Sequence, residues 1–383
     1  MPDHESIFEA AYAPIATELA SLRPPTRVVD AHTHLGLDED GRSLDLETLL
    51  SALEQVGGEA RACVFPLHDP ERSPAYRIPN DRVLAWARES EGRLYPFCRL
   101  DPREDPVAEA ERCLALGARG IKLHPRAQAF GFGDRAAESI FAVARDAGVP
   151  ILIHAGRGMG RMDALADLAL RYPEVPIVLA HAAIADQGMF ATRLGDHPAV
   201  VYDTSCFAAY DVVELFARVP AERVVFASDI PYGRPLPALH LAMRVAAYAG
   251  LDADECALVA GGTMTALVEG RPLAPAAPPR IPQIRSVSGR LVRLAGYIAT
   301  AFGAIVGGGP PIEPMRGLGH LALARTVCRD PDPGVVGPAL ERIDALLAAA
   351  EELIAGGAEN PLPAFGLLVA AGAIAATEPA VAP

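Results

Sequence analysis

Lysine is almost absent from this chain. The sequence of 383 residues contains 34 basic residues, and all of them except Lys122 are arginines. Arginine stays charged at ordinary pH, whereas the amine of a buried lysine can lose its proton and react as a base or form a carbamate. Because the one lysine lies in the motif Gly-Ile-Lys-Leu-His-Pro at 120–125, we expect it to have a chemical role.

Positive charge and paired cysteines are also scarce. The net charge of −14 argues against nucleic acid as a partner, because phosphate binding needs a basic face. The six cysteines are scattered and form no C-x-x-C pair, which favours reduced, buried thiols. The first residues, Met-Pro-Asp-His-Glu, are acidic and unlike a signal peptide. We therefore expect a cytoplasmic protein.

Long hydrophobic runs are missing as well. The two uncharged stretches, 294–309 and 360–377, are short for a membrane span and are diluted by glycine, alanine or proline. They read as buried helices, so we expect no membrane partner. Hydrophobic residues nevertheless make up 51% of the chain, which is typical of a globular protein with a sizeable core.

Short apolar runs alternate with amphipathic segments through the first 270 residues. The segments between the runs have apolar residues at helical spacing. Eight such units predict a closed (β/α)8 TIM barrel rather than an open Rossmann sheet, which would need a glycine-rich turn after its first strand. The runs predicted as strands are 27–35, 61–67, 94–100, 120–125, 150–156, 176–183, 200–206 and 223–232, and the helices between them include 44–57, 81–90, 106–117, 135–148, 162–172 and 211–219.

The composition predicts four regions. Residues 1–26 form an N-terminal helical segment, 27–270 the barrel, 271–283 a proline-rich linker and 284–383 a C-terminal helical region. The clearest helices of the last region are 291–306 and 338–355, with 317–327 as a third. No motif for chemistry is visible there, and packing, dimerisation and covering of the barrel mouth all stay open. We expect a homo-oligomer.

Polar residues follow the apolar runs at the carboxyl ends of the predicted strands, where barrel enzymes place their reacting groups. His32 and His34 have i, i+2 spacing on the first strand, so both point to one side and can share a metal ion. The later strands add residues of the same kind, namely Lys122, His124, His154, His181 and Asp229. Three histidines and a carboxylate suit a divalent ion such as Zn²⁺ that activates a water. His181 and Asp229 are the candidates for moving a proton.

The set Asp-x-His-x-His, His, His and Asp over 27–270 resembles the amidohydrolase superfamily. The motifs Gly-Ile-Lys-Leu-His-Pro and Ala-Ser-Asp-Ile-Pro-Tyr-Gly are most similar to those of its amidohydrolase-2 branch. That branch includes the aminocarboxymuconate-semialdehyde decarboxylase-like enzymes. The resemblance implies metal binding by His32, His34, His154 and Asp229. It implies a proton-transfer role for His181, which in some members binds a second metal instead.

Two residues of the motifs keep alternative roles. In members with two metals a carboxylated lysine bridges the ions, and Lys122 lies on the matching strand. The Lys-x-His-Pro context favours the version with one metal, in which a cationic lysine holds a substrate oxygen. Asp30 either touches the metal or orients His32.

Several cationic side chains follow the same strand ends. They suggest an anionic substrate with a carboxylate group. The predicted substrate-binding residues are His124, Arg126, Arg157 and Arg234, with Arg99, His68 and Arg161 nearby in the pattern.

Three functions compete on this sequence. The first is a metal-dependent hydrolase that cleaves a C–N or C–O bond of a small molecule. The second is a non-oxidative decarboxylase of an aromatic or unsaturated acid, which would use the same ligands. The third is a barrel scaffold without catalysis.

Overall fold

Eight parallel strands form the centre of the protein, as the sequence predicts. The computed structural model describes residues 4–22, 27–57, 59–156, 162–206, 208–280, 288–306, 314–331, 334–356 and 362–378. There is one parallel strand in each predicted run, and the first strand continues two residues beyond its run. The strands are β1 (Val29–Leu37), β3 (Arg61–Pro66), β4 (Leu94–Arg99), β5 (Gly120–Leu123), β6 (Ile151–Ile153), β7 (Ile177–Leu179), β8 (Val200–Asp203) and β9 (Val224–Val225). The short β2 (Ser43–Leu44), which the sequence did not predict, pairs antiparallel with β1.

The segment that follows the last strand closes the barrel onto the first strand. Beyond β9 the chain runs beside β1, and the backbone N–H of Ala31 donates to Phe226, and that of His34 to Ile230, both at 2.9 Å. The N–H of Asp229 donates to the carbonyl of His32, also at 2.9 Å. These bonds bring the ends of the first and last barrel strands together, which places Asp229 beside the histidines of β1.

Side chains fill the inside of the barrel. Buried residues from alternate positions of the strands, among them Val29, Phe65, Phe97, Leu152 and Val178, form a separate apolar cluster there. Gly120 makes room for this packing, because a Cβ at that position would lie 2.4 Å from Cε2 of Phe97. The polar site therefore lies above a tightly packed apolar layer inside the barrel.

Amphipathic helices surround the strands. In α6 (Arg135–Ala147) the buried face is Ala137, Ile140, Phe141 and Ala144, and the helix ends at Gly148 in the left-handed conformation with φ 64°. The remaining barrel helices are α2 (Leu46–Glu54), α3 (Arg77–Glu89), α4 (Pro106–Ala115), α5 (Pro125–Gln128), α7 (Asp163–Arg171), α8 (Gln187–Leu194), α9 (Ala209–Arg218), α10 (Pro235–Ala249), α11 (Ala253–Ala257) and α12 (Thr263–Val268).

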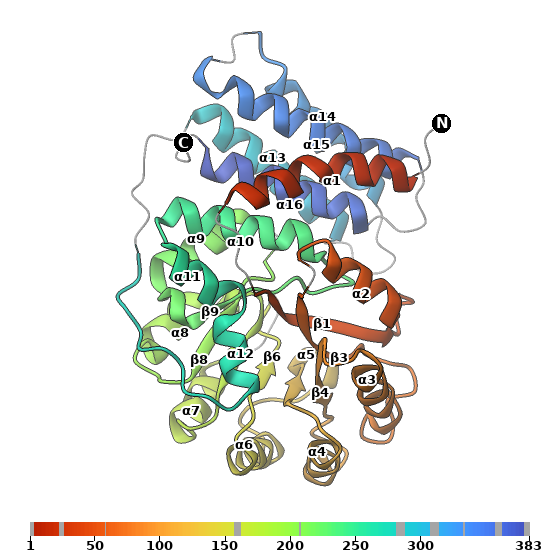
Figure 1. Cartoon of the computed structure of the whole chain (residues 1–383), viewed down its shortest axis with the longest axis vertical. Helices are drawn as coiled ribbons and strands as arrows, with labels where there is room; N and C mark the ends of the chain where they lie inside the picture. The colour runs from red at the N-terminus through yellow and green to blue at the C-terminus, as the bar shows by residue number, and fades with distance from the viewer. Residues whose placement is uncertain are drawn as a thin grey trace.

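The C-terminal region is helical, as predicted, and stacks on one side of the barrel. It comprises α13 (Gly289–Val306), α14 (Leu318–Cys328), α15 (Gly337–Ala355) and α16 (Leu362–Thr377). The N-terminal helix α1 (His4–Ser21) lies in the same layer, which packs against α9 and α10 (Figure 1). None of the helices among the described residues has the length and apolar content needed to cross a membrane. The six cysteines are buried, and none of them forms a disulfide.

A buried polar cluster joins this layer to the barrel. Arg244 of α10 is 1% exposed, and its guanidinium bonds Glu18 of α1, Thr377 of α16 and the adjoining Glu378. Glu18 also accepts from His240 and Arg342. We call these six residues the Glu18 cluster. It connects both ends of the described chain to one barrel helix.

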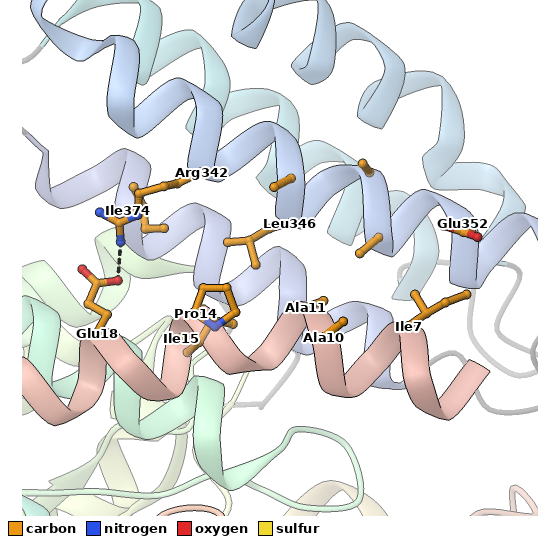
Figure 2. A pocket seen from close by; sticks show the side chains of 13 residues that line it. Ile7, Ala10, Ala11, Pro14, Ile15, Glu18, Arg342, Leu346, Glu352 and Ile374 are labelled. Carbon is orange, nitrogen blue, oxygen red and sulfur yellow. Dashed lines mark hydrogen bonds and ion pairs between the residues drawn. The ribbon is translucent and has the colours of Figure 1, made fainter. Parts of the chain in front are cut away.

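Beside the Glu18 cluster, small side chains leave a cavity of about 560 Å³ between α1 and α15. Figure 2 shows Ala10, Ala11 and Pro14 on one wall and Leu346 on the other, with the Glu18–Arg342 ion pair at one end.

Candidate metal centre

Three of the residues predicted to carry chemistry meet at the middle of β1, namely His32, His34 and Asp229. The imidazoles of His32 and His34 project together, with ring centroids 5.2 Å apart. Asp229 reaches them from a turn in which its own φ is 57°, a left-handed conformation that ordinary residues rarely adopt. All three side chains are buried.

Three ligand atoms of this group surround one point. Oδ1 of Asp229 lies 3.1 Å from Nε2 of His32 and 3.1 Å from Nε2 of His34, and the three atoms are all within 4.8 Å of one another. Two ligands that are each about 2.1 Å from one ion lie about 3.0–3.4 Å apart at octahedral or tetrahedral angles. The spacing therefore fits a single divalent ion.

The two histidines are neutral in this environment. Burial lowers the pKa of His34 to about 3, although Asp229 acts in the opposite direction. Burial also lowers the pKa of His32 far below its usual value, helped by the charge of Lys122. A neutral imidazole has a lone pair, and the lone pair is what binds a metal.

The hydrogen bonds of His32 show which of its two ring nitrogens is free to bind a metal. Its Nδ1 lies 2.8 Å from the Asp203 carboxylate, which can only accept, so Nδ1 carries the ring proton. Nε2 is then a lone-pair atom that faces another lone-pair atom, Oδ1 of Asp229, at 3.1 Å. Such a buried pair is stabilised by a cation. The residues present thus fit a metal ion.

Lys122 is one cation at this position. Its side chain is fully buried, its Nζ donates to Nε2 of His32 at 3.1 Å, and the ammonium lies 4.4 Å from the centre of the Phe65 ring. Burial lowers the pKa of Lys122 to about 7, against the attraction of Asp229. The amine is therefore poised between its charged and neutral forms near neutral pH.

The other predicted histidines continue from His32 as a row. His181 lies 5.2 Å from His32 between ring centroids, its Nε2 is 3.0 Å from Nδ1 of His154, and His154 stacks on His124 at 3.8 Å. His154 is not among the residues whose ligand atoms surround one point with Asp229. Its predicted role as a fourth ligand stays a prediction.

Gly156 allows this row to form. A Cβ at Gly156 would lie 3.0 Å from Nε2 of His154 and 3.1 Å from Cδ2 of His181. His181 itself begins a tight turn with φ 57°, followed by Ala182 and Ala183 with φ 53°. The chain directly after β7 thus turns sharply and presents the imidazole.

Asp30 acts on the backbone. Its Oδ1 accepts from the N–H of His32 and from the N–H of Ser228, so it ties β1 to the segment after β9. Burial raises the pKa of Asp30 to about 7. Of its two predicted roles, the contacts match support of His32, through the main chain instead of the ring.

The predicted cationic residues are dispersed. Arg126 is exposed on α5, and Arg157 lies outside the described residues. Arg234 precedes α10 and is close enough to Tyr12 to lower its pKa against the rise that burial causes. Arg99, by contrast, is 2% exposed on β4 and pairs in register with Lys122.

Two residues of the site were missed by the sequence reasoning. Asp203 ends β8, and besides His32 it accepts from the backbone N–H of His181 at 2.8 Å. The hydroxyl of Ser205 donates to Asp203 at 2.6 Å and contacts Nδ1 of His181 at 2.9 Å. The signal was the same as for the other strand ends, because Val-Val-Tyr-Asp (200–203) also places an acid after apolar residues.

Comparisons with known proteins agree with this architecture. A family model described as Amidohydrolase matches residues 29–268. The fold is similar to that of IDCase from Metarhizium anisopliae in its apo form, at 14% identity and a TM-score of 0.51, over 65% of this chain and 98% of the other. It is also similar to an uncharacterised TIM-barrel protein from Bordetella bronchiseptica, at 14% identity and a TM-score of 0.50, over 64% and 99%. No curated protein matches the sequence. By the match to the family model, the chain belongs to the amidohydrolase family.

Proposed function

We propose that this protein is a metal-dependent hydrolase that cleaves a C–N or C–O bond of a small, carboxylate-bearing substrate. The observation that carries the proposal is the buried approach of two lone-pair atoms, Nε2 of His32 and Oδ1 of Asp229, at 3.1 Å. Membership of the amidohydrolase family supports the hydrolytic reaction.

The ion would be held by His32, His34 and Asp229, with His154 as a further ligand. When bound, it would supply Lewis acidity, which polarises a carbonyl and lowers the pKa of water to about 7. The nitrogen-rich donor set favours Zn²⁺. We propose one ion, or two if Lys122 is carboxylated.

The remaining residues would bind substrate and move protons. Nδ1 of His124 accepts from the N–H of Ala127 at 3.2 Å, so its ring proton is on Nε2 and can be donated to a substrate oxygen. Lys122 would donate to the same group. His181 and Asp229 would take the proton released when water attacks and return it to the leaving group.

Uncompensated positive charge supports an anionic substrate. Arg99 donates to the carbonyl of Pro66 at 3.1 Å, its Nε has no partner, and no carboxylate among the described residues forms an ion pair with it. A buried cation of this kind is stabilised by an anion. Arg126, Arg157 and Arg234 stay proposed as further contacts to substrate.

Metal analysis tests the first half of the proposal. The purified protein should contain about one equivalent of a divalent ion per chain, lose it to a chelator and regain it from Zn²⁺ or Mn²⁺ solutions. The His34→Ala variant should not retain the ion. A matched control is His197→Ala, because His197 is also buried but bonds the carbonyl of Ala169 away from the site. Equal metal content in both variants would contradict the proposal.

A substrate panel tests the second half. The loaded protein should hydrolyse members of a set of carboxylate-bearing amides, lactones and esters, and should lose this activity with the metal. Release of CO₂ from hydroxybenzoates without any hydrolysis would instead identify a decarboxylase. The absence of stoichiometric metal would leave only a scaffold.

The state and place of the protein are proposals too. We propose a homo-oligomer in the cytoplasm that binds neither nucleic acid nor membranes, and the absence of disulfides among the six cysteines supports a reducing compartment. Light scattering of the purified protein tests the oligomeric state.

A further inference from the structure

Asp203 lies at the centre of a hydrogen-bond network beside the proposed metal ligands, although it is not proposed as a ligand itself. It is 0% exposed, and its two oxygens have different partners. Oδ2 accepts from Nδ1 of His32 at 2.8 Å. Oδ1 accepts three donors, namely the N–H of His181 at 2.8 Å, the N–H of Ser205 at 2.9 Å and the hydroxyl of Ser205 at 2.6 Å.

The hydroxyl of Ser205 links the carboxylate of Asp203 to the imidazole of His181. Because its proton goes to Asp203, its oxygen accepts from Nδ1 of His181 at 2.9 Å. The carbonyl of Ser205 accepts from the same nitrogen at 3.0 Å. His181 therefore carries its ring proton on Nδ1, and its Nε2 is an acceptor.

The series of hydrogen bonds from Asp203 continues to His154, with the same order of donor and acceptor. Nε2 of His181 lies 3.0 Å from Nδ1 of His154, and since Nε2 is an acceptor, Nδ1 of His154 is the donor. The Nε2 atom of His154 is then a lone-pair atom, as is Nε2 of His32. His34 differs, because its Nδ1 has no polar partner among the described residues.

We propose that Asp203 is the positioning residue that places the ring proton of His32 on Nδ1, directly, and that of His154 on Nδ1, through Ser205 and His181. Both imidazoles then keep Nε2 free of a proton, which is the state that a metal ion requires. This inference rests on the proposed function only in assigning these nitrogens to a metal.

The substitution Asp203→Asn makes the proposal testable, because the amide can sit in one orientation only. Two of the three donors to Oδ1 are backbone N–H groups that cannot be reversed. The carbonyl of the asparagine must therefore take the Oδ1 position, and its NH₂ group must face Nδ1 of His32. His32 then becomes an acceptor at Nδ1 and moves its proton to Nε2. Replacing an aspartate beside a catalytic histidine reverses the ring tautomer in the same way.

The experiment reads the proton positions without any substrate. Nitrogen NMR of the metal-free protein, labelled at histidine and assigned with His32→Ala and His154→Ala, should show both rings protonated at Nδ1 in the parent protein. In Asp203→Asn, His32 should switch to Nε2–H. Zn²⁺ affinity, measured by competition with a chelator, should fall about 10–100-fold. Asp203→Glu, which keeps a carboxylate, should restore part of it.

Asp69→Asn is the matched control, since Asp69 is also a buried carboxylate but its oxygens pair with Arg82 and not with a histidine ring. It should change neither the tautomers nor the affinity. An Nε2–H tautomer of His32 in the parent protein overturns the proposal even if Asp203→Asn does not fold. An unchanged tautomer and affinity in Asp203→Asn overturns it as well. Failure of the parent protein to bind Zn²⁺ would instead refute the proposed function, and the spectrum of the metal-free protein would still test the proton positions.

Discussion

The amine of Lys122 donates to Nε2 of His32 across 3.1 Å, and neither side chain is more than 1% exposed. The one lysine of the chain is therefore in direct contact with a candidate metal ligand. An arginine in its place would keep the charge but bring a larger, planar group that cannot lose its proton.

We expect Lys122→Arg to reduce turnover at least about tenfold, which corresponds to about 1.4 kcal/mol in the barrier. The kinetics should be measured on a substrate found in the panel, together with metal content. Lys122→Met separates the two effects, because it removes the amine without the extra bulk. Kinetics equal to those of the parent protein in Lys122→Arg would leave Lys122 without a catalytic role.

Metal retention should depend on residues from distant strands. We expect Asp229→Ala and His154→Ala to lower Zn²⁺ affinity about tenfold or more while the circular dichroism spectrum stays that of the folded barrel. The Asp229 variant tests the group that surrounds one point, and the His154 variant tests the predicted fourth ligand. Full metal occupancy in His154→Ala would mean that the ligands are His32, His34 and Asp229 without His154.

A small substitution beside the histidine row should have a local effect. In Gly156→Ala the added Cβ would lie 3.0 Å from Nε2 of His154 and 3.1 Å from Cδ2 of His181, so the rings must move. We expect weaker Zn²⁺ binding with little change in melting temperature. Gly133→Ala is the control, because nothing lies within 4 Å of its added Cβ. Identical affinities in the two variants would contradict a role for the row in metal binding.

Acid should destabilise the metal-free protein. The pKa of His34 is lowered to about 3 and that of His68 to about 4, chiefly by burial, from an ordinary value of 6.5. Between the ordinary and the lowered pKa the unfolded chain binds more protons than the folded one, so the free energy of unfolding falls as pH drops through this window. Asp30, whose pKa is raised to about 7, acts in the opposite direction, but the histidines with lowered pKa outnumber it.

Urea unfolding at several values between about pH 7 and pH 4 measures this effect. The midpoint should decrease steadily with acidification, and His68→Gln should make the decrease smaller. A midpoint that does not change with pH would show that the buried histidines are not neutral in the folded state.

The Glu18 cluster should contribute strongly to stability. Removing one partner of a buried ion pair so that the other charge is left uncompensated typically costs about 3–5 kcal/mol. In Arg244→Met, Glu18 keeps its contacts to His240 and Arg342, so we expect a loss at the lower end of this range, about 3 kcal/mol, measured by chemical unfolding. Arg171→Met is the control, because the Arg171–Glu138 pair is about half exposed, and such surface pairs contribute about 0–1 kcal/mol. Similar losses in both variants would show that the Glu18 cluster contributes no more to the free energy of unfolding than a surface ion pair does.

Much of the site could be predicted from sequence because each strand carries its polar residue locally. His32 and His34 have strand spacing, and Asp229 follows an apolar run, so parity and position are enough to bring them together. The relation between Asp203 and His32 could not be predicted in this way. It depends on the approach of side chains from strands β1 and β8, 171 residues apart in the chain. The run Val-Val-Tyr-Asp (200–203) marks a strand that ends in an acid, but it does not indicate which side chain that acid contacts.

The turns and the helical layer show a second limit. His181, Ala182 and Ala183 adopt left-handed conformations without a glycine to announce them, so tertiary contacts impose the turn. The surroundings of Arg234 depend on Tyr12 from the start of the chain. Local pattern gives the helices of the C-terminal region but not the surface on which they dock.

The docking of α1 against α10, α15 and α16 has a consequence for the order of folding. Tyr12 and Ile15, which are buried in the finished protein, leave the ribosome more than two hundred residues before the first of these partners. Contacts of such sequence separation form late and slow the search for the native state. A helix that is synthesised before the whole barrel is therefore among the last elements to reach its place, and its apolar face is the surface that a chaperone would meet on the nascent chain.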